Sequence, residues 1–421
     1  MLRPEQIEKE IRGNKGPLAQ AGIIVPDYNG YSICRVPGFI RSLFSNGENS
    51  AGPLNTVSPV PTARKVLFIL LDGVGYLYLK DILDRFPDMY LNRLIKRGGL
   101  IPITSVFPAS TATAISSYST GLTPQRHGML GYRLYLKETS AITNMIRLSL
   151  IGNRDGNSAI AAGIDVDTFL GVPTIYEQLN QIGVETHIVL DRRISKSGLS
   201  TLLYRGAQNL HPTVSFSDML VVTRRLLKRS QGETFFSLYW DSIDALGHTY
   251  GPWTEEVTGE LRAIDAALER ELAGGMDDTL LIISSDHGFM TMEETDYLNI
   301  SDYPPLEQAL LLPPVGDTRG AYLFVREGRK KEVSEFLNDN FEGDLLCLDS
   351  RWALRTGLFG SGEQKREIYD RIGDLVVIAT GARALYYPYK GSTKLKGMHG
   401  GVTPEEMLVP LIVRGPEKEE N

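Results

Sequence analysis

The chain has few cysteines, no long hydrophobic run and no block of basic residues. Only Cys34 and Cys347 are present. Two thiols so far apart in the sequence indicate neither a disulfide framework nor a cysteine-based metal motif. The longest apolar runs, such as VLFILL, are far too short to cross a lipid bilayer. The formal net charge is −7 and no Lys/Arg-rich segment stands out, so we predict no nucleic-acid partner.

The sequence also predicts no signal peptide. The N-terminal segment MLRPEQIEKEIRGNKG mixes both signs of charge and has no apolar central region. We therefore predict a cytoplasmic protein with no membrane partner. Hydrophobic residues make up 42% of the 421 residues, which is enough for a sizeable core and typical of a globular protein.

Strand-like apolar segments alternate with helix-like amphipathic segments from Lys65 to about residue 290. The run VLFILL is typical of a parallel strand that is covered on both faces. The segment PTIYEQLNQIG begins with proline and ends with glycine, as helices often do. This alternation predicts an α/β fold with a doubly wound, mostly parallel sheet flanked by helices. Ligands of such sheets bind beyond the carboxyl ends of the strands.

The sequence predicts four regions along the chain. Residues 1–64 form an N-terminal extension that ends in a linker rich in Ser, Asn, Gly and Pro. Residues 65–290 form the catalytic α/β core, and residues 291–395 a smaller inserted α+β subdomain. Residues 396–421 return to the core with a last metal ligand and the final strand MLVPLIV. The extension and the insert are the candidate locations of a substrate pocket or of a homodimer contact.

Acidic and histidine side chains lie next to the strand-like runs, at positions far apart in the sequence. They are Asp72, Asp244, His248, Asp286, His287 and His399. Carboxylates and imidazoles gathered at strand ends form the ligand set of a divalent metal site. These six residues are too many for one tetrahedral ion and enough for two. Alone, each has a commoner explanation, such as a helix cap for Asp72.

Asp244 and His248 are four residues apart, which places them on one face of a helix. Gly247 and Pro252 disfavour a long helix, so we predict a single turn. A surface ion pair is the alternative explanation for these two residues. Three histidines remain. His127 is interpreted as structural or as lying behind the ligands, His187 as a structural residue in a strand, and His211 as part of a loop.

A hydroxyl-rich segment, VFPASTATAISSYSTG, lies between the first candidate ligand and the others. Ser110, Thr111 and Thr113 are all chemically competent nucleophiles. The segment is typical of a strand end followed by a helix, which directs backbone N–H groups at an anion. A threonine hydroxyl becomes a useful nucleophile when a metal lowers its pKa. The alternative is an ordinary Ser/Thr helix cap.

With these motifs, the chain resembles the type I phosphodiesterase/nucleotide pyrophosphatase family of the alkaline phosphatase superfamily. The family segment VFPTKTFPNHY…TG, followed by GLxPxxHG, is similar to VFPASTATAISSYSTGLTPQRHG, and this register places the nucleophile on Thr111. The family motif D-x-x-x-H-x-x-GP is similar to residues 244–252, SDHG to residues 285–288, and GxHG to residues 397–400. The resemblance covers most of residues 65–290 and returns around 397–411.

The resemblance implies an alkaline phosphatase-like fold and a two-metal hydrolase that acts on a small phosphate ester. The implied reaction is that of a phosphodiesterase or nucleotide pyrophosphatase, with a phosphothreonine intermediate at Thr111. The implied cofactors are two divalent ions, expected to be Zn²⁺, with Mn²⁺ or iron as alternatives. The implied ligands are Asp244, His248 and His399 for one ion, and Asp72, Asp286, His287 and the Thr111 oxygen for the other.

The chain departs from the family at one position. Diesterases of the family have an asparagine three residues after the nucleophile, where it binds a phosphoryl oxygen, and this chain has Ala114. Thr113, backbone amides and Arg133 are the candidate substitutes. The change leaves open a phosphomonoesterase, a phosphonate hydrolase, or a degenerate homologue that only binds a phosphorylated ligand. A sulfatase is disfavoured because no C/S-x-P-x-R segment occurs at the nucleophile.

Overall fold

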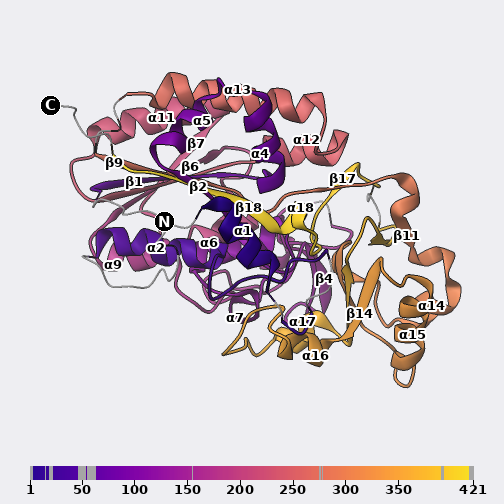
Figure 1. Cartoon of the computed structure of the whole chain (residues 1–421). Helices are drawn as coiled ribbons and strands as arrows, with labels where there is room; N and C mark the ends of the chain where they lie inside the picture. The colour runs from indigo at the N-terminus through magenta and orange to yellow at the C-terminus, as the bar shows by residue number, and fades with distance from the viewer. Residues whose placement is uncertain are drawn as a thin grey trace.

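The structure is a computed structural model of the chain (Figure 1). It describes residues 3–14, 16–18, 22–45, 54, 63–153, 155–274, 276, 278–389 and 393–416. Most of the linker predicted before Lys65 lies outside these residues.

A seven-stranded sheet forms the centre of the larger part, in the order β2-β18-β9-β1-β8-β6-β7. Its strands are β1 (Lys65–Leu71), β2 (Gly99–Thr104), β6 (Glu185–Asp191), β7 (Asn209–Thr213), β8 (Thr234–Trp240), β9 (Thr279–Ser284) and β18 (Leu408–Arg414). Neighbouring strands pair in parallel except at β18, which is antiparallel to β9 and β2. The predicted α/β fold with a mostly parallel sheet is therefore confirmed.

Helices cover both faces of this sheet (Figure 1). One face carries α4 (Tyr76–Arg85), α5 (Tyr90–Arg97), α11 (Phe216–Arg229), α12 (Ser242–Tyr250) and α13 (Glu255–Leu272). The other carries α2 (Val36–Phe44), α6 (Thr111–Thr120), α9 (Ile175–Gln181) and α10 (Gly198–Leu203). Every residue of β1 is buried, and its side chains alternate between the two cores. This is why the run VLFILL has no polar face.

A second sheet packs beside the first, in the order β14-β15-β13-β12-β3-β4-β5. Its strands are β3 (Arg133–Leu136), β4 (Ala141–Asn144), β5 (Ser149–Leu150), β12 (Val315–Asp317), β13 (Gly320–Leu323), β14 (Leu345–Asp349) and β15 (Leu375–Ala379). All neighbouring strands in this sheet pair in the antiparallel direction. Gly316 pairs with Arg133, so the sheet joins strands from both sides of residue 290.

Shorter elements complete the described structure. Two-stranded sheets form between β10 (Met290–Thr291) and β17 (Gly397–Met398) and between β11 (Tyr297–Asn299) and β16 (Ala384–Tyr386). The other helices are α1 (Pro4–Arg12), η1 (Ile33–Arg35), α7 (Pro124–His127), α8 (Ser158–Ala161), η2 (Glu294–Asp296), η3 (Ile300–Asp302), α14 (Pro304–Ala309), α15 (Lys330–Asn340), α16 (Ser350–Arg355), α17 (Ile368–Ile372) and α18 (Pro404–Met407).

The N-terminal region packs against the segment that leads to the hydroxyl-rich helix. The Tyr28 hydroxyl donates to the Leu358 carbonyl at 2.8 Å and accepts the Phe107 N–H at 3.1 Å. Ile24 N–H donates to the Val402 carbonyl at 2.7 Å. These bonds tie Ile24 and Tyr28 to the loops that follow α16 and β2 and precede α18.

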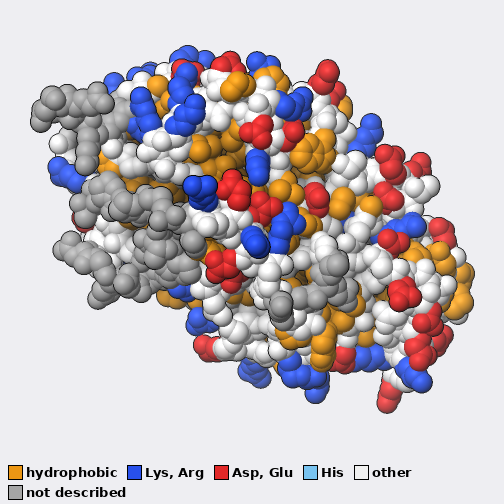
Figure 2. All heavy atoms as spheres, viewed as in Figure 1, with side chains coloured by type: hydrophobic (Ala, Val, Ile, Leu, Met, Phe, Trp, Pro, Cys, Tyr) orange, Lys and Arg blue, Asp and Glu red, His pale blue; other side chains and the backbone are white. Residues whose placement is uncertain are grey.

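The described surface gives two further findings. On the face shown in Figure 2, Lys and Arg side chains are interspersed with Asp and Glu, without a continuous basic stripe of the kind that nucleic-acid sites use. Among the described helices, none combines the length and the apolar character that crossing a bilayer requires.

Candidate active site and metal centre

The carboxyl ends of adjacent strands bring the predicted ligands together. Asp72 directly follows β1, and Asp286 lies two residues past the end of β9. Asp244 belongs to α12, which follows β8, and β9, β1 and β8 are neighbours in the sheet. His399 follows β17, on the loop that leads to β18. Parallel strands end at the same edge of a sheet, so residues from distant parts of the chain meet there.

The six residues form two groups, and within each group the ligand atoms lie within 4.8 Å of one another. In the first, His287 Nε2 lies 3.4 Å from Asp72 Oδ1 and 3.5 Å from Asp286 Oδ2, and all three side chains are buried. In the second, Asp244 Oδ1 lies 3.4 Å from His248 Nε2 and 3.9 Å from His399 Nε2. These are the two sets that the resemblance implies.

Backbone carbonyls fix the orientation of all three imidazoles. His248 Nδ1 donates to the Gly397 carbonyl at 2.8 Å, His287 Nδ1 to the Gly288 carbonyl at 3.2 Å, and His399 Nδ1 to the Ala109 carbonyl at 3.0 Å. A proton on Nδ1 leaves the Nε2 lone pair available. Such bonds are typical of metal-binding histidines, because they select the tautomer and hold the ring.

The carboxylates present oxygens that fit a cation. Within the described residues, Asp72 Oδ1, Asp244 Oδ1 and Asp286 Oδ2 have no hydrogen-bond donor. The other oxygens of the two deeper acids are satisfied: the Tyr239 hydroxyl donates to Asp72 Oδ2, and the Gly73 and His287 amides donate to Asp286 Oδ1. A buried carboxylate oxygen without a partner is costly, and a divalent ion supplies the missing partner. The residues present therefore fit two divalent metal ions.

The charge state of the site points the same way. Burial, followed by the nearby charges of Asp286 and Asp244, raises the pKa of Asp72 well above its usual value. Burial, followed by the charges of His287 and His248, lowers the pKa of His399 well below its usual value. A bound cation reverses the effect on the acid and favours the neutral imidazole.

Thr111 lies at the start of α6, a ten-residue helix. Its Oγ1 lies 3.2 Å from His287 Nε2, which places the hydroxyl at the first metal group. Ser110 before it is extended, and its side chain makes no capping bond to the helix. The amides of the first turn of α6 lie beside the same hydroxyl, where they can bind an anion.

The remaining candidates lie at different depths. Arg133 lines the cavity in front of Thr111, whereas Thr113 and Ala114 are fully buried and do not line it. His127 is also fully buried: its Nε2 lies 3.0 Å from Ser117 Oγ, and burial lowers its pKa to about 3.

Two local predictions were wrong. Residues around Asp244 and His248 form a nine-residue helix, α12, and not a single turn. Gly247 is tolerated inside this helix because its missing side chain makes room for the Phe289 ring. His211, predicted in a loop, lies in β7, because its strand pairs in parallel with the strand of His187.

A cavity of about 450 Å³ opens in front of the site, large enough for a small organic ligand. Thr111, Asp72, Asp244, His248 and His399 lie in its wall. Its polar and aromatic lining includes Tyr132, Arg133, Tyr204, Tyr239, Asp317 and Tyr386, and its aliphatic lining includes Ile115, Ile194, Leu199 and Leu203.

Sequence reasoning missed two polar residues of this cavity. Tyr239 is the penultimate residue of β8, and its position at a strand end close to Asp244 is a signal that could have found it. Asp317 is different: it comes from β12 of the second sheet, and no local pattern predicts that this strand reaches the site.

Asp317 is buried against the loops that surround Thr111. Its Oδ2 accepts the Tyr132 N–H at 3.3 Å, and its carboxylate hydrogen-bonds to the Ser110 side chain. Burial raises the pKa of Asp317 to about 7, although Ser110, Tyr132 and Arg133 each act to lower it. The carboxyl group therefore changes charge near neutral pH.

We expect Asp317→Asn to change how stability depends on pH. The folded-state pKa of Asp317 lies above its ordinary value of 3.8, so the wild type loses stability as pH rises from about 4 to about 7. The asparagine variant lacks this loss, and its stability relative to wild type should rise by about 2–3 kcal/mol between pH 5 and pH 8. Urea unfolding of both metal-free proteins at the two pH values measures the difference. If the two proteins differed in stability by the same amount at both pH values, the raised pKa of Asp317 would be contradicted.

A buried ion pair holds the loop of His399. Arg319 Nε lies 2.6 Å from Glu406 Oε1 and Nη2 lies 2.8 Å from Oε2, and both side chains are fully buried. Glu406 also accepts the Gly401 N–H at 2.8 Å and the Thr403 hydroxyl at 2.7 Å. Its backbone carbonyl accepts the Gly288 N–H at 2.9 Å. The pair therefore links the second sheet to the loops that carry His399 and His287.

Known proteins have sequences similar to this chain. Residues 66–402 match the profile of the family described as type I phosphodiesterase/nucleotide pyrophosphatase. A bis(5'-adenosyl)-triphosphatase of Xenopus laevis is 26% identical over 329 residues, covering 72% of this chain and 67% of the relative. Human ectonucleotide pyrophosphatase/phosphodiesterase family member 1 is 24% identical over 242 residues, covering 52% of this chain and 24% of the relative. The chain spans at most about two thirds of the length of these curated relatives.

Solved structures share the fold. Human ectonucleotide pyrophosphatase/phosphodiesterase 5 superposes with a TM-score of 0.64 at 19% identity, covering 84% of this chain and 88% of that one. Phosphonoacetate hydrolase from Sinorhizobium meliloti superposes with a TM-score of 0.63 at 20% identity, covering 86% and 92%. These neighbours have the alkaline phosphatase-like fold. Together with the profile match over most of its length, this shows that the chain belongs to the type I phosphodiesterase/nucleotide pyrophosphatase family.

Proposed function

We propose that this chain is a two-metal hydrolase of small phosphate esters that acts as a phosphodiesterase or nucleotide pyrophosphatase. The observation that carries the proposal is the position of Thr111 Oγ1, 3.2 Å from His287 Nε2 at the wall of the cavity and beside two groups of potential ligands. Family membership supports it, as do relatives named for pyrophosphatase and triphosphatase activity. A murine relative was solved in complex with AMP, which supports a nucleotide-sized substrate.

The proposed cofactors are two Zn²⁺ ions, with Mn²⁺ or iron as alternatives. Asp72, Asp286, His287 and the Thr111 oxygen would hold one, and Asp244, His248 and His399 the other. When bound, such a pair lowers the pKa of a hydroxyl and stabilises charge on phosphoryl oxygens.

The residues of the chain then have the following roles. The Thr111 hydroxyl gives its proton to solvent and its Oγ attacks phosphorus, the bond to the leaving oxygen breaks, and that oxygen leaves with a proton from solvent. Water next cleaves the phosphothreonine ester, which releases a phosphomonoester and restores the Thr111 hydroxyl. The amides at the start of α6 bind the phosphoryl oxygens in both steps.

Arg133 is the proposed substitute for the family asparagine. Its guanidinium carbon lies 4.7 Å from the Tyr132 ring centroid and 4.8 Å from that of Tyr389, so two aromatic rings hold it at the cavity. Thr113, the other side-chain candidate, does not line the cavity. A guanidinium suits a phosphate or carboxylate oxygen.

Ala114 also keeps a second reaction class open. Without the asparagine amide, and with an arginine at the cavity, the site suits a substrate with an additional negative charge, such as a phosphomonoester or a phosphonate. A degenerate, ligand-binding homologue is disfavoured because the chain retains the Thr111 hydroxyl together with both groups of potential metal ligands. A homodimer and a cytoplasmic location stay sequence-based predictions.

Metal analysis combined with a substrate panel tests the proposal. We expect two equivalents of metal in the purified protein, loss of activity after chelation, and recovery with Zn²⁺ or Mn²⁺. The panel consists of bis(p-nitrophenyl) phosphate, p-nitrophenyl phosphate, a dinucleoside triphosphate and phosphonoacetate. Preference for bis(p-nitrophenyl) phosphate or the dinucleoside triphosphate supports a phosphodiesterase or nucleotide pyrophosphatase. Preference for p-nitrophenyl phosphate or phosphonoacetate supports the second class. Two bound ions without turnover of any of the four would contradict both.

A further inference from the structure

One aromatic ring contacts all three histidines of the two metal groups. The Phe289 ring centroid lies 5.1 Å from that of His248, 5.6 Å from that of His287 and 5.5 Å from that of His399. The ring planes cross at 88°, 82° and 85°, so each contact is edge-to-face. His287 and His399, which belong to different groups, also stack on each other at 3.6 Å. Phe289 is therefore a shared support of both groups.

Glycines make room for this ring on three ligand-bearing segments. A Cβ atom built on Gly73 would lie 2.6 Å from the Phe289 ring, one on Gly247 would lie 2.8 Å away, and one on Gly397 would lie 3.1 Å away. Gly73 follows the ligand Asp72, Gly247 precedes the ligand His248, and Gly397 lies two residues before His399. Any side chain at these positions would push the ring or the ligand segment out of place.

The backbone around the ring is held as well. Met290 pairs with Met398 across the β10–β17 sheet, which sets Phe289 relative to His399. The Lys396 N–H donates to the His248 carbonyl at 3.0 Å, which ties α12 to the same sheet. Phe289 is itself buried, with 4% of its surface exposed.

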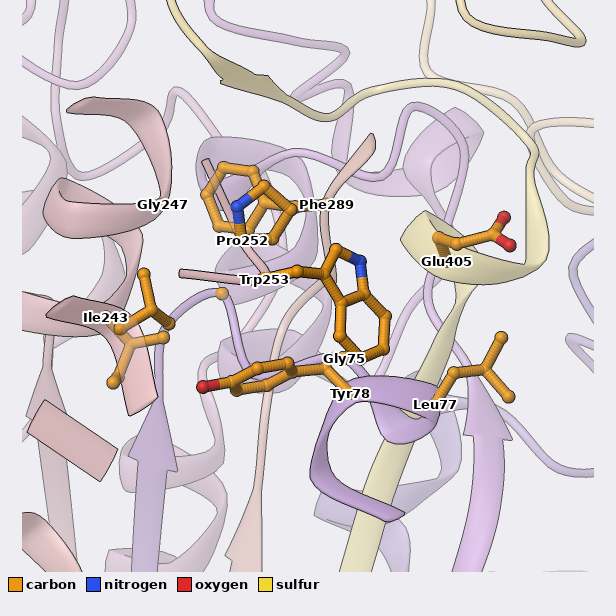
Figure 3. Close-up of a pocket in the computed structure, with 11 residues that line it drawn as sticks. Gly75, Leu77, Tyr78, Ile243, Gly247, Pro252, Trp253, Phe289 and Glu405 are labelled. Atoms are coloured by element: carbon orange, nitrogen blue, oxygen red, sulfur yellow. The ribbon is translucent and has the colours of Figure 1, made fainter. Parts of the chain in front are cut away.

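A small cavity borders the Phe289 ring. Figure 3 shows the cavity there, with Phe289 and Gly247 in its lining and the indole of Trp253 beside them. Its volume is about 10 Å³, which is about the minimum for one water molecule. None of the three histidines lines it. Phe289 therefore borders this small cavity, whereas the three histidines that it contacts do not.

We propose that Phe289 is a positioning residue that sets the orientation of all three histidines and so couples the two metal sites. The inference rests on the proposed two-metal function. It differs from a general packing role because it predicts that a single substitution weakens both sites together. Residues behind metal ligands typically change metal affinity by about 10–100-fold when they are replaced.

The test is a zinc titration of the full chain carrying Phe289→Leu, against a competing chromophoric chelator. We expect both equivalents to bind about 10–100-fold more weakly than in the wild type. The Co²⁺ absorption spectrum of the variant should also change, because the imidazoles reorient. Phe235→Leu is the matched control: it removes a similarly buried ring, 1% exposed, from the second position of β8, and it should leave both affinities and the spectrum unchanged.

Gly247→Ala is the second variant, which keeps the ring but brings a methyl group within 2.8 Å of it. We expect this variant also to bind both equivalents of zinc more weakly. It provides the test if Phe289→Leu does not fold. Unchanged affinities in either folded variant, or weakening of one site alone, would overturn the inference. A wild-type chain that binds fewer than two ions would instead overturn the proposed function.

Discussion

Thr111→Ala is expected to reduce kcat by at least about 10³-fold, because the covalent intermediate can no longer form. The variant should still bind two metal ions, since six carboxylate and imidazole ligands remain. The measurement combines kcat on bis(p-nitrophenyl) phosphate with the metal content of the same sample. Loss of turnover with metal retained separates a missing nucleophile from a collapsed site.

Ser116→Ala is a matched control for this substitution. Ser116 lies on the same helix, and its hydroxyl is buried and donates only to the Ala112 carbonyl, at 2.7 Å. It does not line the cavity, so this variant should keep wild-type kcat. Full turnover by Thr111→Ala would show that another oxygen attacks phosphorus. Thr111→Ser, which keeps a hydroxyl at the same position, should retain part of the activity.

Glu406→Gln is expected to lower the free energy of unfolding by about 3–5 kcal/mol, a large part of the 5–15 kcal/mol of a typical domain. The amide leaves the guanidinium of Arg319 buried without its counter-charge. The Glu406 carboxylate also accepts the Gly401 N–H in the loop of His399, so this loop should loosen as well. Urea unfolding measures the loss of stability, and weaker zinc binding by the folded fraction reports on the loop of His399.

Lys331→Ala is the comparison for this second prediction. Lys331 pairs with Glu335 at 3.5 Å, but the two side chains are 85% and 60% exposed. Exposed pairs contribute about 0–1 kcal/mol, so this variant should unfold almost as the wild type does. A Glu406→Gln variant as stable as Lys331→Ala would mean that Arg319 finds other partners. Its bonds to the Gly381 and Arg383 carbonyls, at 2.8 and 2.7 Å, are the candidates.

Much of the fold follows from local patterns. The strands β1 and β9 lie where continuous apolar runs occur, and the helices α9 and α13 lie where amphipathic segments do. Each of these patterns involves residues that are close together in the sequence. It can therefore be recognised without knowing which distant segments the strand or helix packs against. The length of α12 could not be recognised in this way, because Gly247 is favourable only with Phe289 against it.

Some residues of the candidate site could likewise be recognised from the sequence, and others could not. Its ligand types and its hydroxyl could be recognised because each follows or precedes an apolar strand, and the family resemblance assigned them to two groups. The role of Phe289 could not be recognised, although this residue directly follows the SDHG motif. An aromatic residue in an apolar segment looks like any other core residue until its neighbours are known.

The sequence by itself determined the class of fold, the chemical types of the ligands and the family to which the chain belongs. Only the tertiary structure decided that Asp317 reaches the cavity, that Arg319 and Glu406 hold the ligand loops, and that one phenyl ring contacts three imidazoles. The physical reason is the distance along the sequence over which each kind of interaction acts. Periodicity and capping act over one or two turns of chain, whereas these contacts depend on the order and twist of strands that are far apart in the sequence.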